Sequence, residues 1–364
     1  MTIEAFRKDG DTFQVQELIG RGKRLKILAI GFIPPPLGGI SVSFKIFCDI
    51  VSIRDDVDLM VINVSGMNQR NQLFLESLGL LVRLWHNIAK SDVVTLYCST
   101  EQVPSLAAAT WIFCRLLRKS FILRMGAGLD HRELGPIIGR VAEFVAKRVD
   151  LFLVQTKLLV ETCRLRGFTR VDWYPTSRLA GLPMASRAKC RRFVFIGHVR
   201  PSKGMEELIA AAERLPKSAI VDVYGPFFDG IDTSIFEGRK HIFYKGVLDP
   251  DKVVGTMREY DAFVLPSKAF TEGYPGAILE ALSVGMPIIS TTVGGIPEIL
   301  DEKCSILVEP GDKRALADAM HRLVNNEDLY HELCRGALEV RNRFSAEYWA
   351  NWLVDQCARM SWLV

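Results

Sequence analysis

Two glutamates eight residues apart are the most chemically informative feature of the sequence. Glu272 and Glu280 enclose the stretch EGYPGAILE, residues 272–280, which holds no other charged side chain. Pro275 is typical of a helix start, so Glu280 is expected inside an otherwise apolar helix. An ionised carboxylate there is costly unless it is paired or hydrogen-bonded. The carboxylate of Glu280 therefore needs a partner. One possibility is a ligand with vicinal sugar hydroxyls, because one carboxylate can accept two O–H hydrogen bonds. The other is an arginine elsewhere in the chain that forms a structural salt bridge.

A second stretch with chemical potential is FIGHVRPSKGMEELI, in which a predicted strand ends at Gly197 and a helix follows. Arg200 and Lys203 lie between them, beside a helix N-terminus whose free amides and dipole favour an anion. Two cations at that point suit a diphosphate, although a solvated loop with ordinary surface cations is the alternative. The amides of Gly276 and Ala277, at the next helix start, are expected to receive phosphate or sugar oxygens.

Alternating strands and helices must position these residues. Short apolar runs predict strands at 25–33, 57–64, 93–98, 120–125 and 150–154, and again at 193–197, 219–224, 241–245, 261–265, 286–290 and 305–308. Helical patterns between them, such as 104–119, 136–149 and 204–215, favour parallel sheets covered on both faces. A Pro-, Ser- and Arg-rich break at 175–192 separates two Rossmann-like halves. We therefore expect an α/β fold with domains at 1–182 and 183–342, followed by a C-terminal helix at 343–364.

Composition excludes several classes of protein. Neither half has Gly-x-Gly-x-x-Gly after its first strand, which disfavours a dinucleotide-dependent dehydrogenase. The eight cysteines and six histidines show no metal-ligand spacing, so no metal and no cofactor are expected. No apolar run reaches the roughly 18 residues that span a bilayer, and the N-terminal stretch lacks a signal-peptide core, so the cytoplasm is the expected location.

The run 261–300 resembles the donor-binding signature of retaining GT-B glycosyltransferases, family 4, of the type that builds bacterial surface polysaccharides. Its elements occur here in order: Pro266-Ser267, Glu272, Glu280, Gly285-Met286-Pro287 and Gly294-Gly295-Ile296-Pro297-Glu298. The loop at 197–204 resembles the phosphate-binding Gly-Arg-x-x-x-x-Lys-Gly of that family. The resemblance covers most of the C-terminal half, whereas in the N-terminal half it rests on PPPLGGI, residues 34–40, and on the layout.

The resemblance implies two Rossmann-like domains that face each other across a cleft, and a metal-independent, retaining, hexosyltransferase-type enzyme. Such an enzyme is expected to transfer sugar from a nucleotide diphosphate sugar, with uridine diphosphate favoured and guanosine diphosphate mannose as the alternative. By the same resemblance, Glu280 is expected to bind the ribose, Glu272 to lie by the donor sugar, and Arg200 and Lys203 to stabilise the leaving diphosphate. The donor site further includes Gly197, Tyr274, Pro275, Gly276 and Ala277.

The chain departs from that family in three places. His198 stands where the family often has arginine, and Arg200 is expected to take the phosphate role instead. Met125-Gly126 replaces a His-Gly near the reacting carbon, which leaves Asp130 or His131 as candidates. The segment YPTSR, 174–178, replaces the usual Pro-Asn-Gly at the domain junction.

The acceptor is expected to bind the first half. Gly38 and Gly39 are predicted to let backbone approach the diphosphate or the acceptor, with a plain strand–helix turn as the alternative. Residues 1–186 hold 24 Lys and Arg against 17 Asp and Glu, which suggests an anionic partner. The basic, tryptophan-containing segment 78–90 is compatible with contact with an anionic inner membrane face, and equally with burial, while 110–120 favours a core helix.

A glycan or a lipid-linked saccharide is therefore the expected acceptor, a soluble small molecule is its alternative, and no nucleic-acid partner is expected. Two functions compete with sugar transfer: a nucleotide-sugar epimerase of the same fold, and a sugar-nucleotide-binding protein without catalysis. The last helix, with Trp349, Trp352 and Trp362, is expected to pack on the first domain.

Overall fold

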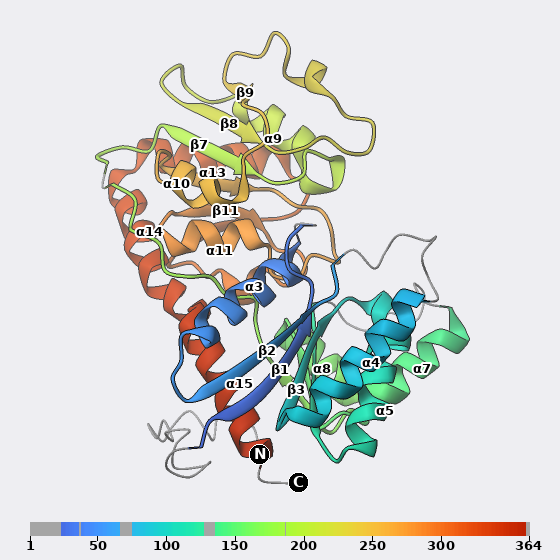
Figure 1. Ribbon diagram of the computed structural model, residues 1–364. Helices are drawn as coiled ribbons and strands as arrows, with labels where there is room; N and C mark the ends of the chain where they lie inside the picture. Colours follow the sequence, from blue (N-terminus) through green and yellow to red (C-terminus); the bar gives the residue numbers. More distant parts are fainter. Residues whose placement is uncertain (1–22, 36–37, 66–74, 127–134, 186, 362–364) are drawn as a thin grey trace. The chain divides into compact units, whose positions relative to one another are not determined.

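The structure is a computed structural model that describes residues 23–35, 38–65, 75–126, 135–185 and 187–361 (Figure 1). The chain divides into two compact units. Unit 1 comprises 1–154, 160–174 and 347–364, and unit 2 comprises 155–159 and 175–346. The chain thus changes unit at 154/155, 159/160, 174/175 and 346/347. The boundaries expected from the sequence fall after residues 182 and 342.

Unit 1 is built on a six-stranded parallel sheet with the order β2-β1-β3-β4-β5-β6. The strands are β1 (Leu25–Gly31), β2 (Val57–Asn63), β3 (Val93–Cys98), β4 (Ser120–Met125), β5 (Leu151–Val154) and β6 (Val171–Trp173). Every residue of β3 and β4 is buried, as expected for central strands covered on both faces. The first five strands were predicted. The edge strand β6 was missed because its three residues, with Asp172 in the middle, give no apolar run.

The helices of unit 1 are α3 (Gly39–Ser52), α4 (Leu75–Lys90), α5 (Ala108–Leu116), α7 (Pro136–Ala146) and α8 (Lys157–Leu165), of which the first three residues of α8 belong to unit 2. The helix predicted over 104–119 begins instead with a π-helical turn, Val103–Ala107, which continues into α5. Figure 1 shows α4, α5 and α7 together, and α5 contacts both of its neighbours. Within the described residues, no helix has the length and apolar character needed to cross a membrane.

The last helix, α15 (Ala346–Ser361), packs on unit 1 through aromatic side chains. Trp349 is 1% exposed, and its ring centroid lies 5.0 Å from that of Trp173 and 5.8 Å from that of Tyr174. Trp352 also contacts Tyr174, at 5.8 Å. Trp362 lies outside the described residues.

Unit 2 contains a second six-stranded parallel sheet, with the order β12-β11-β10-β7-β8-β9. Its strands are β7 (Arg192–Ile196), β8 (Ile220–Tyr224), β9 (Ile242–Tyr244), β10 (Ala262–Leu265), β11 (Ile288–Thr291) and β12 (Ser305–Val308), all predicted from the sequence. The chain runs outward from β7 to β8 and β9 on one side, and from β10 to β11 and β12 on the other. The strand order therefore reverses between β7 and β10.

The helices of unit 2 are α9 (Met205–Ala212), α10 (Val253–Met257), α11 (Gly276–Ser283), α12 (Ile296–Ile299), α13 (Lys313–Asn325) and α14 (Glu327–Val340). Crossovers between parallel strands are right-handed, so the opposite directions of β7-α9-β8 and β10-α11-β11 place α9 and α11 on opposite faces. Helix α13 packs beside α9, and α10 packs beside α11 (Figure 1). The predicted α/β fold class, with two Rossmann-like parallel sheets, is confirmed.

Candidate functional site

Lys203 and Glu272, predicted separately as site residues, form an ion pair in unit 2. The Lys203 ammonium lies 2.8 Å and 2.6 Å from Oε1 and Oε2 of Glu272, and Ser267 lies 2.9 Å from Oε2. Lys203 follows β7, and both Ser267 and Glu272 follow β10. Ligands of open α/β sheets bind outside the carboxyl ends of the strands where the strand order reverses. The pair therefore lies where this fold forms a binding site.

Glycines hold the two loops of this pair close to their neighbours. Gly204, at φ +75°, lies so near the Pro266 carbonyl that a Cβ would overlap its oxygen. A Cβ on Gly294, at φ +54°, would likewise overlap the carbonyl oxygen of Glu272. The amide of Gly295 donates to that same carbonyl at 2.8 Å. Residues other than glycine rarely adopt such backbone angles. The Gly-Gly of the signature thus supports the loop that carries Glu272.

The start of α11 presents free backbone donors. Pro275 is the N-cap residue and has extended backbone angles, and the helix begins at Gly276. Neither the amide of Gly276 nor that of Ala277 has an acceptor among the described residues. Such amides, together with the helix dipole, favour an anion. Lys203 offers a full positive charge and this helix start offers free amides and a partial positive charge, and both favour a diphosphate.

Glu280, one turn into α11, pairs with an arginine that the sequence did not identify. Nε of Arg178 donates to Oε1 of Glu280 at 2.9 Å, and the two side chains are 9% and 21% exposed. The salt-bridge alternative foreseen for Glu280 is thus present. Oε2 of Glu280 accepts no hydrogen bond from the residues that the structure describes, so the carboxylate keeps accepting capacity. Arg178 belongs to the segment YPTSR, residues 174–178. The departure of this segment from the family pattern was the available signal that Arg178 has a role here.

Tyr274 contributes to the loop and presents little surface to a ligand. Its side chain is 4% exposed, and its hydroxyl donates to Glu298 at 2.7 Å. Glu298 also accepts from the amides of Lys157 and Leu158, at 2.6 Å and 3.0 Å. The final Glu of the signature therefore anchors Tyr274 and caps the first turn of α8, a structural role that sequence reasoning left unassigned.

Arg200 and His198 have partners of their own beside Gly197 at the end of β7. Nε and Nη2 of Arg200 lie 2.9 Å and 2.8 Å from Oδ2 of Asp229, so Arg200 is turned to this carboxylate. The ring of His198 lies 4.4 Å from that of Phe228. Burial, followed by the positive charges of Lys203 and Arg200, lowers the pKa of His198 below its ordinary value of 6.5. His198 is therefore a neutral hydrogen-bonding group at pH 7, unlike the arginine it replaces.

The predicted acceptor loop lies in unit 1 and is described in part. Gly39 is the first residue of α3, and Gly38 precedes it with a φ of −163°. A Cβ on Gly38 would meet Ser41 Oγ at 3.8 Å, and a Cβ on Gly39 would meet no atom within 4 Å. The packing of unit 1 therefore does not itself require glycine here. Asp130 and His131 lie outside the described residues.

No three or more His, Cys, Asp and Glu side chains gather as a metal site in the described part of the chain.

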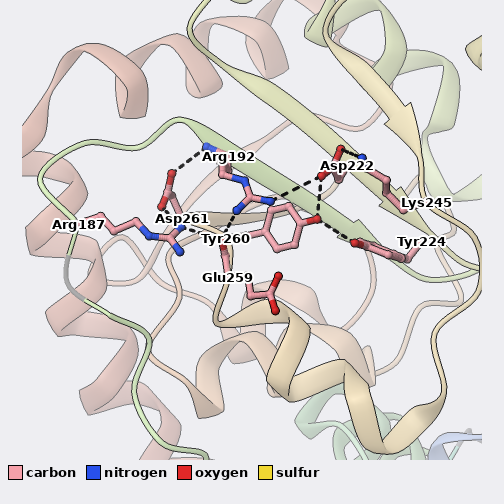
Figure 2. A network of polar contacts seen from close by, with 8 residues as sticks. All are labelled: Arg187, Arg192, Asp222, Tyr224, Lys245, Glu259, Tyr260 and Asp261. Atoms are coloured by element: carbon pink, nitrogen blue, oxygen red, sulfur yellow. Dashed lines mark hydrogen bonds and ion pairs between the residues drawn. The ribbon is translucent and has the colours of Figure 1, made fainter.

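A second charged cluster in unit 2 holds the starts of β7 and β10 together. Asp261, directly before β10, accepts from the amides of Arg191 and Arg192 at 2.7 Å and 2.8 Å. Nη1 of Arg187 donates to Oδ1 of Asp261 and to the Glu259 carbonyl, each at 2.7 Å. Both oxygens of Asp261 are thus engaged by the chain itself, as Figure 2 shows in part.

Tyr260 extends this cluster into the unit. Its hydroxyl donates to Asp222 at 2.8 Å and lies 2.9 Å from the Tyr224 hydroxyl (Figure 2). The Arg192 guanidinium lies over the Tyr260 ring at 4.7 Å, and Lys245 lies 3.7 Å from Asp222. Burial, followed by hydrogen bonds with Tyr224 and Asp222, raises the pKa of Tyr260, which remains a donor at physiological pH.

Comparison with known proteins places this geometry in a class. The fold of Anabaena HepE, solved with UDP and with UDP-glucose, covers 92% of this chain and all of its own, with a TM-score of 0.73 and 16% identity for the UDP complex. Sucrose-phosphate synthase from Thermosynechococcus elongatus gives a TM-score of 0.71 at 16% identity, over 94% of this chain and all of its own. The chain has the GT-B glycosyltransferase fold.

Residues 190–326 match the family "Glycosyl transferases group 1". The sulfoquinovosyl transferase SQD2 of Arabidopsis thaliana is 27% identical over 156 residues, which are 42% of this chain and 30% of SQD2. The O-antigen chain mannosyltransferase C of Escherichia coli is 29% identical over 167 residues, 45% of this chain and 44% of the relative. The matches thus span less than half the length of these relatives. The resemblance to GT-B glycosyltransferases that the signature indicated is confirmed, whereas retention at the anomeric carbon stays a prediction.

Proposed function

We propose that the protein is a metal-independent glycosyltransferase that moves a sugar from a nucleotide diphosphate sugar to a saccharide acceptor, with retention at the anomeric carbon. The observation that carries the proposal is the joining of Lys203 and Glu272 beside the open N-terminus of α11, at the strand-order reversal of a group 1 domain. The UDP and UDP-glucose bound to HepE support UDP as the nucleotide. Relatives named for O-antigen and for amylovoran biosynthesis support a polysaccharide product.

The residues take complementary roles in this reaction. A lysine ammonium has three N–H donors, of which Glu272 engages two, so one remains for a diphosphate oxygen. The amides of Gly276 and Ala277 and the dipole of α11 add donors for the same group. Negative charge grows on the diphosphate as the glycosidic bond breaks, so these contacts strengthen toward the transition state and lower the barrier. Glu272 lies beside this charge, where the donor sugar carbon becomes positive.

Glu280 serves the nucleotide instead of the reacting bond. Its Oε2 accepts no bond from the described residues and is suited to the ribose hydroxyls. Arg200 is paired with Asp229 in this structure. It binds the leaving diphosphate if it releases this carboxylate when the donor is bound.

A thermal-shift screen across nucleotide sugars tests the donor, because a ligand that binds the folded state raises the melting temperature by mass action. We expect UDP-sugars to stabilise the protein and turnover to survive a chelator. Donor incubated alone separates two rivals: isomerised sugar would support an epimerase, and binding without turnover on any saccharide acceptor would support a non-catalytic protein. Loss of turnover with chelator would contradict metal independence.

We propose in addition that the acceptor is a lipid-linked saccharide, reached through contact of unit 1 with an anionic membrane. Apolar side chains are exposed on three helices that pack together: Leu78, Val82 and Trp85 on α4, Ile112 and Leu116 on α5, and Ile137, Val141 and Phe144 on α7. Arg83, Arg115 and Arg140 lie on the same helices. Apolar side chains beside cations are the pattern of membrane-surface binding.

Vesicle binding by the full chain tests this contact. We expect binding to phosphatidylglycerol vesicles at low salt and release at high salt, because exposed charges are screened beyond about 8–10 Å at physiological ionic strength. Val82→Glu should weaken binding, whereas Ile53→Glu, at an exposed position after α3, should leave it unchanged. Equal binding by both variants, or none by the parent protein at low salt, would favour a soluble acceptor.

A further inference from the structure

Arg178 is fixed in place more firmly than a surface arginine. Its amide donates to the carbonyl of Phe344, and its own carbonyl accepts from the amide of Ala346, each at 3.0 Å. Nη1 donates to the carbonyl of Ser177 at 3.1 Å, and only 9% of the side chain is exposed. The backbone and the guanidinium are thus both held before any ligand arrives.

The guanidinium lies along the first turn of α11. Nε bonds to Oε1 of Glu280, and Nη2 lies so close to Gly276 that a Cβ there would overlap it. Gly276 and Glu280 are one helical turn apart, so Arg178 spans the space between the helix start and the carboxylate. A side chain at position 276 would displace the arginine, which gives Gly276 a reason to be glycine.

A purely structural ion pair would use the carboxylate more fully. Arginine can bind a carboxylate through two parallel N–H bonds, yet here one nitrogen meets one oxygen. Oε2 of Glu280 accepts nothing from the described residues, and 21% of the side chain is exposed. A half-used carboxylate, clamped on one oxygen by a buried arginine, is oriented for a ligand at the other oxygen.

We infer that Arg178 is a positioning residue that holds Glu280 for the ribose of the nucleotide. The inference rests on the proposed function and deepens it, because it explains how a flexible glutamate recognises ribose. Immobilising a side chain on binding costs about two- to tenfold in affinity. Arg178 removes that cost by ordering Glu280 in the free protein.

Calorimetric affinities for UDP and for its 2′-deoxy and 3′-deoxy analogues test this inference. Hydrogen bonds to charged groups are strong, so the parent protein should prefer UDP over at least one analogue by about tenfold or more. Arg178→Ala should lower the affinity for UDP by about two- to tenfold and the affinity for that analogue by less, so that the preference for UDP shrinks. Arg178→Lys, which keeps the charge without the fixed fork, should restore part of the preference.

Arg187→Ala is the matched control, because Arg187 also pairs with a carboxylate of unit 2, that of Asp261, which lies at the start of β10 and so at the sheet edge opposite the strand ends that Lys203 and Glu272 follow. It should leave the preference for UDP unchanged. An unchanged or increased preference in Arg178→Ala, whatever its melting temperature, would show that Arg178 does not orient Glu280. Failure of the parent protein to bind UDP or GDP would instead refute the proposed function.

Discussion

Unit 2 contains two clusters in which arginine or lysine meets buried or half-buried carboxylates, and they differ in what they leave unused. At the starts of β7 and β10, Asp261 is 1% exposed and accepts from two amides and Arg187. Beside the start of α11, Glu280 gives one oxygen to Arg178, and Glu272 holds a lysine that retains a donor. Both oxygens of Asp261 are satisfied by the chain itself.

Unused hydrogen-bonding capacity distinguishes a binding site from a structural cluster better than the presence of an ion pair does. Both clusters contain ion pairs shorter than 3 Å, so short distance alone does not distinguish them. Buried polar groups are normally satisfied by the protein, and capacity left over near a helix N-terminus requires a ligand or water. The positions of the two clusters in the sheet support the same distinction. Lys203 and Glu272 follow the carboxyl ends of their strands, where ligands bind, whereas Asp261 precedes the start of a strand.

The largest effect is expected from Lys203→Ala. It removes a charge that stabilises the leaving diphosphate, and loss of one such donor lowers kcat by about 10²–10³-fold. Steady-state kinetics with a UDP-sugar would measure it, with Arg187→Ala as the variant of the other cluster that should keep normal turnover. Intact turnover in Lys203→Ala would place the diphosphate elsewhere.

Asp261→Ala should act on stability instead. Removing one partner of a buried, hydrogen-bonded pair costs about 3 kcal/mol, or about 6–12 °C in melting temperature for a unit of this size. Thermal unfolding monitored by circular dichroism would measure the loss, and the affinity for UDP at low temperature should be unchanged. A weakened affinity for UDP in the folded variant would contradict the division into two clusters.

Glu280→Gln should have a smaller effect, confined to the nucleotide. The amide keeps the shape but lacks the charge, so UDP affinity should fall by about tenfold, corresponding to one charged hydrogen bond. Kinetics should show this as a raised KM for the donor, with a kcat reduced far less than in Lys203→Ala. Equal losses of kcat in the two variants would assign Glu280 to the reaction itself.

The smallest effect concerns His198. Its pKa is lowered by burial and then by Lys203 and Arg200, so NMR titration should place it below 6.5, and Lys203→Met should raise it. As pH falls below 6.5, the unfolded chain binds a proton that folded His198 resists, so stability falls relative to His198→Gln. At higher pH this difference should vanish. A pKa unchanged by Lys203→Met would show that the lysine charge does not reach the ring.

The sequence determined the strands, the fold class and the signature loops, because these follow from local patterns. Buried parallel strands are continuous apolar runs, and all eleven predicted strands end within two residues of the observed ends. The strand β6 lacked that pattern. Pro275 and the glycines at 276, 294 and 295 marked a helix start and a tight loop from residue type alone.

Only the tertiary structure decided which charges meet. Arg178 and Glu280 are 102 residues apart and Lys203 and Glu272 are 69 apart, and no local pattern encodes such pairs. The sheet order fixes them, because it brings the ends of β7 and β10 together and lays the segment at 178 along α11. The same packing turned Arg200 to Asp229 and buried Tyr274, since the direction of a side chain depends on neighbours that are distant in the sequence.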